Sequence, residues 1–180
     1  DVMSDLPQAD RIAGLPHPCE TELLFGHDAA CAQVLEAFNG DRMHHAWMLT
    51  GPKGIGKASL AYHIARFLLA SEPAGDSLFG ASPPATSLFV PADLPVARRI
   101  RAGSEPGLCV LRRPVDEKTG KLKTVIPVHT VRELRRFFSL SAGGNGRRVV
   151  IVDCIDEMNA NAANALLKVL EEPPQDAVLL

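Results

Sequence analysis

Residues 49–60 read LTGPKGIGKASL, and within this stretch residues 51–57 match the pattern of a phosphate-binding loop. Gly51, Gly56 and Lys57 stand where the pattern G-x-x-x-x-G-K-[ST] requires them. The next residue should be a hydroxyl that helps to bind Mg²⁺, and it is Ala58. The stretch therefore predicts a loop shaped for phosphate that lacks one side chain for the metal.

The flanking residues give this loop the strand–loop–helix setting that phosphate binding needs. HHAWMLT (44–50) predicts a short buried strand, and ASLAYHIARFLLA (58–70) has the apolar spacing of a helix. Backbone N–H groups at a helix N-terminus attract anions, and glycines let the backbone approach them closely. Ser59 is a poor substitute for the missing hydroxyl, because neighbouring helical residues point about 100° apart. The predicted ATP-binding residues are Gly51, Pro52, Lys53, Gly54, Ile55, Gly56, Lys57, Ala58, Ser59 and Asp153.

Asp153 joins this set because it ends RRVVIVDC, the most strand-like run in the chain. In P-loop ATPases an aspartate at such a strand end holds the water shell of Mg²⁺. The glutamate that commonly follows it and activates water is replaced by Cys154, and losing a general base costs about 10²–10⁴ in rate. We interpret Asp156 and Glu157 as carboxylates favoured by a helix start. The sequence thus predicts no catalytic residue, no intrinsic ATP hydrolysis and a defective Mg²⁺ site.

The remaining pattern alternates strands with helices, which predicts an α/β fold with a parallel sheet covered by helices on both faces. The predicted helices are a segment from Asp28, as its N-cap, to Asn39-Gly40, a short one in 95–103, and 129–142 and 159–172. The predicted strands are 108–113, 147–154 and 177–180, with a hairpin over 116–128 and a glycine stop at 143–146.

The expected organisation is an N-terminal arm over 1–26 and a core over 27–180. Within the core, the Pro- and Ser-rich stretch 71–106 is expected to be an irregular surface insertion. The last residue stands inside an apolar strand, so we expect a fragment or the ordered part of a longer chain.

Composition narrows the possible functions. A net charge of −2 and a pI of about 6.3 argue against nucleic-acid binding through overall basicity. The four cysteines form no C-x-x-C pair, which argues against zinc and disulfides. No apolar run approaches the ~20 residues of a membrane span, and we expect a cytoplasmic location. The small basic clusters, which are expected to be solvated surface or DNA and partner contacts, are Arg98, Arg99 and Arg101, and Lys118, Lys121 and Lys123.

Two blocks, HHAWMLTGPKGIGKASLAYHIARFLL and VVIVDCIDEMNANAANALLKVLEEPP, resemble the AAA+ domains of bacterial DNA polymerase III clamp-loader subunits. NALLKVLEEPP (164–174) is the more specific one. Ala58, Cys154 and the absence of a four-cysteine module place the resemblance with the delta prime branch, which commonly lacks working ATPase motifs. The resemblance implies an AAA+ RecA-like P-loop fold whose lid and collar domains would follow Leu180.

The resemblance also implies a role. The chain would be a scaffold in ATP-dependent loading of the sliding clamp onto primed DNA during replication, with gamma/tau and delta subunits as partners. It would belong to a DNA-directed DNA polymerase (nucleotidyltransferase) holoenzyme. Two alternatives stay open: an active gamma/tau-like ATPase motor that uses Ser59 or water, and an interaction module with an empty nucleotide site. A P-loop kinase is disfavoured, because it gives no reason for the block at 164–174.

Overall fold

A three-stranded parallel sheet forms the centre of the protein, whose computed structural model describes residues 7–71, 83–139 and 146–180. The strands lie in the order β1-β2-β3, and their register pairs Cys109 with Val150 and Val149 with Val178. Their bounds, which confirm the predicted strands, are β1 (Leu108–Arg112), β2 (Arg148–Asp153) and β3 (Ala177–Leu179).

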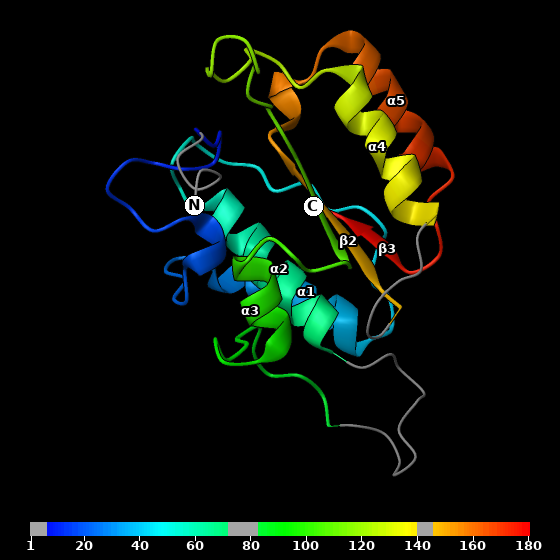
Figure 1. Ribbon diagram of the computed structural model, residues 1–180. Helices are drawn as coiled ribbons and strands as arrows, with labels where there is room; N and C mark the ends of the chain where they lie inside the picture. Colours follow the sequence, from blue (N-terminus) through cyan, green and yellow to red (C-terminus); the bar gives the residue numbers. More distant parts are fainter. Residues whose placement is uncertain (1–6, 72–82, 140–145) are drawn as a thin grey trace.

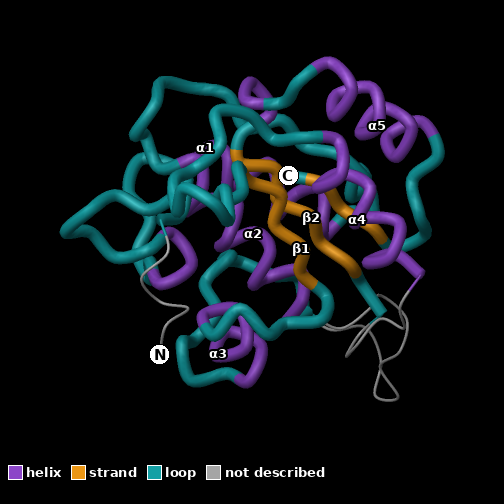
Figure 2. Tube along the Cα trace, turned by 45° about the horizontal axis from the view of Figure 1, so that its top comes forward, coloured by secondary structure: helices purple, strands orange, loops and turns teal. Residues whose placement is uncertain are grey.

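Helices cover both faces of this sheet, as the sequence predicted (Figures 1 and 2). Successive side chains of β2 point to opposite faces, so Val149 and Ile151 enter one hydrophobic core and Val150 the other. All three are at most 2% exposed. The first core is closed by α1 (Asp28–Asn39), α2 (Lys57–Ala70) and α3 (Pro95–Arg101), and the second by α4 (Val128–Ser139) and α5 (Ala160–Glu171).

The helix predictions hold, with one local correction. Asn159 caps α5 because its side chain accepts a hydrogen bond from the N–H of Ala162 at 2.8 Å. Asp28 is not the N-cap of α1, as predicted, but its first helical residue, and His27 occupies the cap position without a side-chain hydrogen bond. The predicted end of α4 at 140–142 and most of the glycine stop, 143–145, lie outside the described residues.

Residues 44–50 depart from the predicted buried strand. They make only an isolated parallel bridge between Ala46 and Leu179, with hydrogen bonds from Trp47 N to Leu179 O and from Leu179 N to His45 O. The segment lies beyond β3 at the sheet edge, and no described strand pairs with its other side. It is therefore not buried, and Met48 is 76% exposed.

The stretch 71–106 contributes to the core in a way that the sequence did not predict. Residues 72–82 lie outside the described part of the chain. Beyond them Leu88 and Val90 are buried, and α3 confirms the short helix that was expected at 95–103. Three residues of α3 at helical spacing, Val96, Ala97 and Ile100, pack into the first core.

The predicted hairpin after β1 is present in reduced form. Val115 and Leu122 make one antiparallel bridge, and Asp116 N donates to Lys121 O at 2.8 Å. The Asp116 carboxylate accepts hydrogen bonds from the N–H groups of Lys118 and Thr119, which fixes the turn. Two short 3-10 helices, η1 (Pro18–Glu20) and η2 (Ile155–Glu157), complete the described elements. Among the described helices, none has the length and apolarity that crossing a bilayer would require.

The described part of the N-terminal arm, residues 7–26, lies against α2. The carbonyl oxygen of Thr21 accepts hydrogen bonds from His63 Nε2 at 2.8 Å and from Arg66 Nη2 at 2.7 Å. Both donors are at least 95% buried, with exposed fractions of 5% for His63 and 3% for Arg66. One backbone carbonyl thus ties the arm to the middle of α2.

We predict that His63 makes the protein less stable in acid. Burial and the nearby Arg66 guanidinium lower the pKa of His63 from 6.5 to about 4. The unfolded imidazole therefore takes up a proton at a higher pH than the folded one. Stability that is present above pH 6.5 is lost as the pH falls through about 4, by roughly 3 kcal/mol in total.

Urea unfolding between neutral pH and about pH 4 measures this loss. The substitution His63→Gln keeps a donor for Thr21 O and should flatten the acid slope. The same change at exposed His129 is the matched control for the loss of one imidazole. An acid slope that is unaltered in His63→Gln would contradict the assignment.

Candidate functional site

The glycine loop, residues 51–56, leads from the 44–50 segment into the N-terminus of α2. Gly54 and Gly56 have φ angles of 86° and 94°, a left-handed region that other residues rarely adopt. Gly56 is the N-cap residue of α2 and offers no side-chain hydrogen bond to the helix. The first N–H groups of α2 therefore have no side-chain cap, and together with the helix dipole they favour an anion.

Lys57 folds back over the loop that precedes it. Its ammonium group donates hydrogen bonds to the carbonyl oxygens of Gly51 at 2.8 Å and Pro52 at 3.0 Å. These two bonds close the loop around its own lysine. A phosphate that binds here gains the positive charge of Lys57 if the ammonium turns from these two carbonyls toward it.

A second contact holds the loop from outside. His27 Nε2 lies 3.0 Å from the carbonyl oxygen of Ile55, which links the start of α1 to the loop. A methyl group placed on Gly56 would come within 3.1 Å of the same His27 nitrogen. His27 and Gly56 therefore fit together closely, and the sequence pattern gave no indication of this contact.

The predicted acidic residue lies on the same cavity as the loop lysine. A cavity of about 360 Å³ is lined by Lys57 and Ala58 from α2 and by Asp153 and Cys154 from the end of β2. Most of its other lining is apolar, including Trp47, Leu49, Ile151 and Leu166. Fold and sequence agree here, because residues almost 100 positions apart converge on one site.

The other predicted site residues lie nearby with less direct roles. Gly51, Pro52, Lys53, Gly54 and Ile55 form the exposed part of the loop. Ser59 is not among the residues that line the cavity, in agreement with its expected direction away from the site. Asp156, which we interpreted as a helix-start carboxylate, does line the cavity from η2, whereas Glu157 pairs with Arg113 at 2.7 Å.

Burial and neighbouring charges shift the pKa values of Asp153 and Cys154, the two residues that line the cavity from the end of β2. Burial raises the pKa of Asp153, and Asp10 and Glu157 raise it further, against the effect of Arg112 and Lys57. Burial and the neighbouring carboxylates also raise the pKa of the Cys154 thiol, which keeps it protonated and unsuited to act as a base or ligand.

Ala58 adds a methyl group where an oxygen ligand would be needed. Within the described ranges, no group of three or more His, Cys, Asp or Glu side chains is arranged to hold a metal ion. Lys57 and the helix N-terminus can contact a phosphate group, whereas position 58 offers no ligand to a metal ion.

The arm brings one further carboxylate to this end of the sheet. Asp10, with a fully buried side chain, accepts a hydrogen bond from Arg112 Nη1 at 2.7 Å and lies 3.1 Å from His17 Nε2. Arg112 is the register partner of Asp153 across β1 and β2. The sequence could not reveal this cluster, because Asp10 and Arg112 are 102 residues apart and no local pattern links them.

We predict that Gly56→Ala destabilises the protein more than Gly54→Ala. Both substitutions force a left-handed conformation that costs about 1–2 kcal/mol. At Gly54 the added methyl group has no neighbour within 4 Å, whereas at Gly56 it meets His27 at 3.1 Å. Displacing His27 breaks its hydrogen bond to Ile55 and adds about 0.5–1.5 kcal/mol.

Urea unfolding of both variants, alone and combined with His27→Ala, measures the difference. It should disappear once His27 is removed. Equal losses for the two glycines in the otherwise unchanged protein would contradict a close fit between His27 and the loop.

Comparison with known proteins now adds to this geometry. A family model described as DNA polymerase III, delta subunit, matches residues 26–180. The chain is 40% identical over 136 residues to the DNA polymerase III subunit delta' of Pseudomonas aeruginosa, which covers 76% of this chain and 36% of that protein. It is 30% identical over 138 residues to the delta' subunit of Bacillus subtilis, covering 77% of this chain and 36% of that protein.

A gamma subunit is also similar. The DNA polymerase III subunit gamma of Buchnera aphidicola is 30% identical over 139 residues, covering 74% of this chain and 31% of that protein. The chain therefore spans only about a third of the length of these relatives. The family model covers most of the chain, and the first two relatives carry the same subunit name, so the chain belongs to the DNA polymerase III delta' subunit family.

Proposed function

We propose that the chain is the N-terminal AAA+ domain of a delta-prime-like clamp-loader subunit. In this role it is a scaffold in the ATP-dependent loading of a sliding clamp onto primed DNA, in the cytoplasm, and does not itself hydrolyse ATP. Its partners are gamma/tau and delta subunits. Residues 27–180 form the domain core in this proposal, and residues 1–26 form an arm, of which the described residues 7–26 pack on the core.

This proposal rests on the residues that line the cavity of about 360 Å³ at the glycine loop. Lys57 and Asp153, which a P-loop ATPase uses, line it together with Ala58 and Cys154, which replace the metal's hydroxyl ligand and the general base. The site thus has the loop lysine and the strand-end aspartate of an ATPase, but it lacks the metal's hydroxyl ligand and the general base. This combination favours a structural role within a family of ATP-driven assemblies.

The finer fold assignment, an AAA+ RecA-like P-loop domain, rests on where the loop lies. It follows the 44–50 segment, which pairs with β3, and β3 in turn pairs with β2, whose carboxyl end carries Asp153. The loop and Asp153 thus both lie at the carboxyl ends of parallel strands, where ligand sites in α/β folds occur. The assignment depends on this common position of the loop and Asp153.

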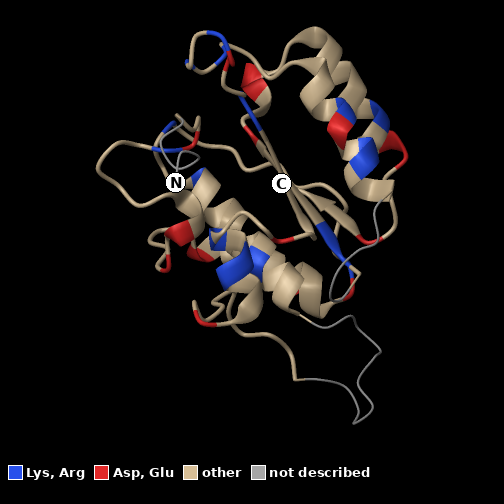
Figure 3. Cartoon of the chain, in the orientation of Figure 1, with Lys and Arg blue, Asp and Glu red and all other residues tan. Residues whose placement is uncertain are grey.

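A groove between α4 and α5 suits the contact with DNA. It holds about 530 Å³ and is lined by Arg132, Arg135 and Lys168, by Asn161 and Asn164, and by small apolar side chains. No carboxylate is among these lining residues, although α4 and α5 carry acidic residues elsewhere (Figure 3). Arginine, lysine and asparagine side chains are typical donors to the phosphate backbone of DNA.

The active-motor alternative differs in what Lys57 does. A motor subunit needs Lys57 for hydrolysis, whereas a scaffold needs the surfaces of α4 and α5. We therefore compare two kinds of variant in a clamp loader reconstituted with gamma/tau and delta subunits, in which the subunit that carries this domain takes the place of delta prime.

We predict that Lys57→Ala leaves clamp loading within about twofold of the unchanged complex, because no catalytic step passes through this loop. The double variant Arg132→Gln/Lys168→Gln should load more slowly. It should also reduce the salt dependence of DNA binding, by about 0.9 in slope for each phosphate contact that is lost. Steady-state loading and anisotropy titrations over a range of salt concentrations measure both effects.

Arg136→Gln is the matched control, since Arg136 is exposed on α4 but does not line the groove. It should load normally. A loss of loading in Lys57→Ala that is as deep as the loss after the same change in the gamma subunit would refute the scaffold role and support the motor. Normal DNA binding by the double variant would refute the groove as the DNA contact.

A further inference from the structure

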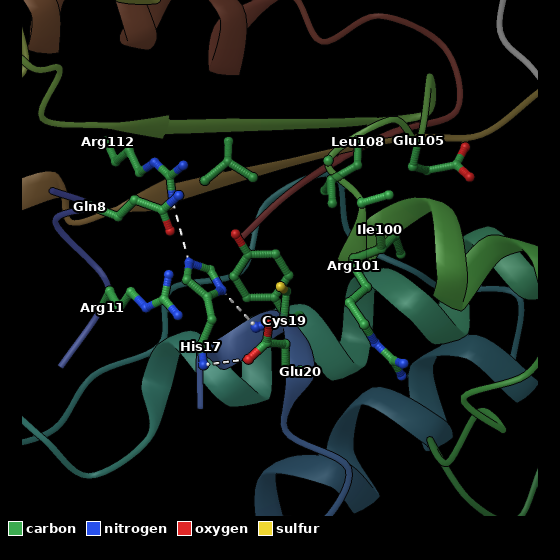
Figure 4. Close-up of a pocket in the computed structure, with 14 residues that line it drawn as sticks. Gln8, Arg11, His17, Cys19, Glu20, Ile100, Arg101, Glu105, Leu108 and Arg112 are labelled. Atoms are coloured by element: carbon green, nitrogen blue, oxygen red, sulfur yellow. Dashed lines mark hydrogen bonds between the residues drawn. The ribbon is translucent and has the colours of Figure 1, made fainter. Parts of the chain in front are cut away.

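A second cavity, of about 520 Å³, lies between the N-terminal arm, α3 and β1 (Figure 4). Its lining shares no residue with the cavity at the glycine loop. Tyr62, Leu108 and Val110 form part of its wall, and residues 102–103 form another part. The proposed clamp-loader function assigns no role to this cavity, whose volume lies in the range of small-molecule sites.

The carboxylates around this cavity are already bound within the protein. Glu20 accepts a hydrogen bond from His17 N at 3.0 Å. Glu105 accepts hydrogen bonds from Arg99 Nε at 2.7 Å and from Gly107 N at 3.1 Å. Asp10, behind the wall, is shared between His17 and Arg112. Asp10 neutralises Arg112, whereas none of these three carboxylates pairs with Arg11 or Arg101.

The arginines that line the cavity differ in how far they are engaged within the protein. The side chain of Arg11 is exposed and has no hydrogen-bond or ion-pair partner among the described residues. Arg101 is 41% exposed, and its ion pair within the described residues is a long one, at 3.9 Å to Glu22. Arg112 is bound to Asp10 through Nη1 and remains 30% exposed. Figure 4 shows Arg11, Gln8 and Arg112 gathered near His17 on one side of the cavity, with Arg101 on the other.

We propose that this cavity binds a small phosphate-bearing molecule, with its phosphate held by Arg11 and Arg112 and its remainder lying against Leu108 and Val110. Guanidinium groups form strong, charge-assisted hydrogen bonds to phosphate. The Gln8 amide adds a neutral donor on the same side of the cavity. The site is independent of the glycine loop, so this inference stands whether or not the loop binds ATP.

Calorimetric titration of the chain carrying Lys57→Ala with AMP tests this proposal, since that background removes the loop lysine. Adenosine, which lacks the phosphate, is the matched ligand. We expect AMP to bind and adenosine not to bind at millimolar concentrations. Arg11→Gln, an exposed change that leaves the fold intact, should weaken AMP binding about tenfold, as expected for one charge-assisted contact.

Arg98→Gln is the control variant, because Arg98 lies on α3 outside the cavity and donates to the backbone oxygen of Asp93. It should bind AMP as the Lys57→Ala background does. The absence of AMP binding, equal binding of adenosine, or an affinity unchanged by Arg11→Gln would each overturn the proposal. A smaller loss in Arg101→Gln than in Arg11→Gln would support the phosphate position beside Arg112.

Discussion

Burial of β2 on both faces is the constraint on which the rest of the structure depends. Val149, Val150 and Ile151 are almost completely buried, and each contributes about 1.5–3 kcal/mol of hydrophobic stabilisation. Their alternation divides the protein into two cores, one with α1, α2 and α3 and the other with α4 and α5. Because β2 is buried on both faces, Asp153 is held in a defined position at the carboxyl end of this strand.

The residues that shape the glycine loop are separate from the side chains that would take part in ATP hydrolysis. The geometry of residues 51–57 depends on backbone conformation, on the start of α2 and on the contact with His27. None of these requires a hydroxyl at position 58 or a carboxylate at position 154. Ala58 and Cys154 can therefore replace reactive groups without disturbing the fold that placed them together.

The sequence predicted the parts of this protein that local patterns determine. RVVIVD and NALLKVLEE have the apolar periodicity of β2 and α5, and the glycine pattern located the loop and Lys57. It failed where neighbours far along the chain decide. The 44–50 segment is apolar enough for a buried strand but lies at an open edge, and α3 is packed although its surroundings are rich in proline and serine. The contacts of Asp10 and His27 leave no local signal at all.

We propose that the glycine loop binds phosphate without the help of a metal ion. Calorimetric titration of the unmodified chain with ATP, in the presence and absence of Mg²⁺, tests it most directly. We predict that ATP binds and that Lys57→Ala removes this binding. Mg²⁺ should change the affinity for ATP by less than about twofold, since Ala58 supplies no metal ligand. ATP binding that depends strongly on Mg²⁺ would contradict it and would indicate a working ATPase site.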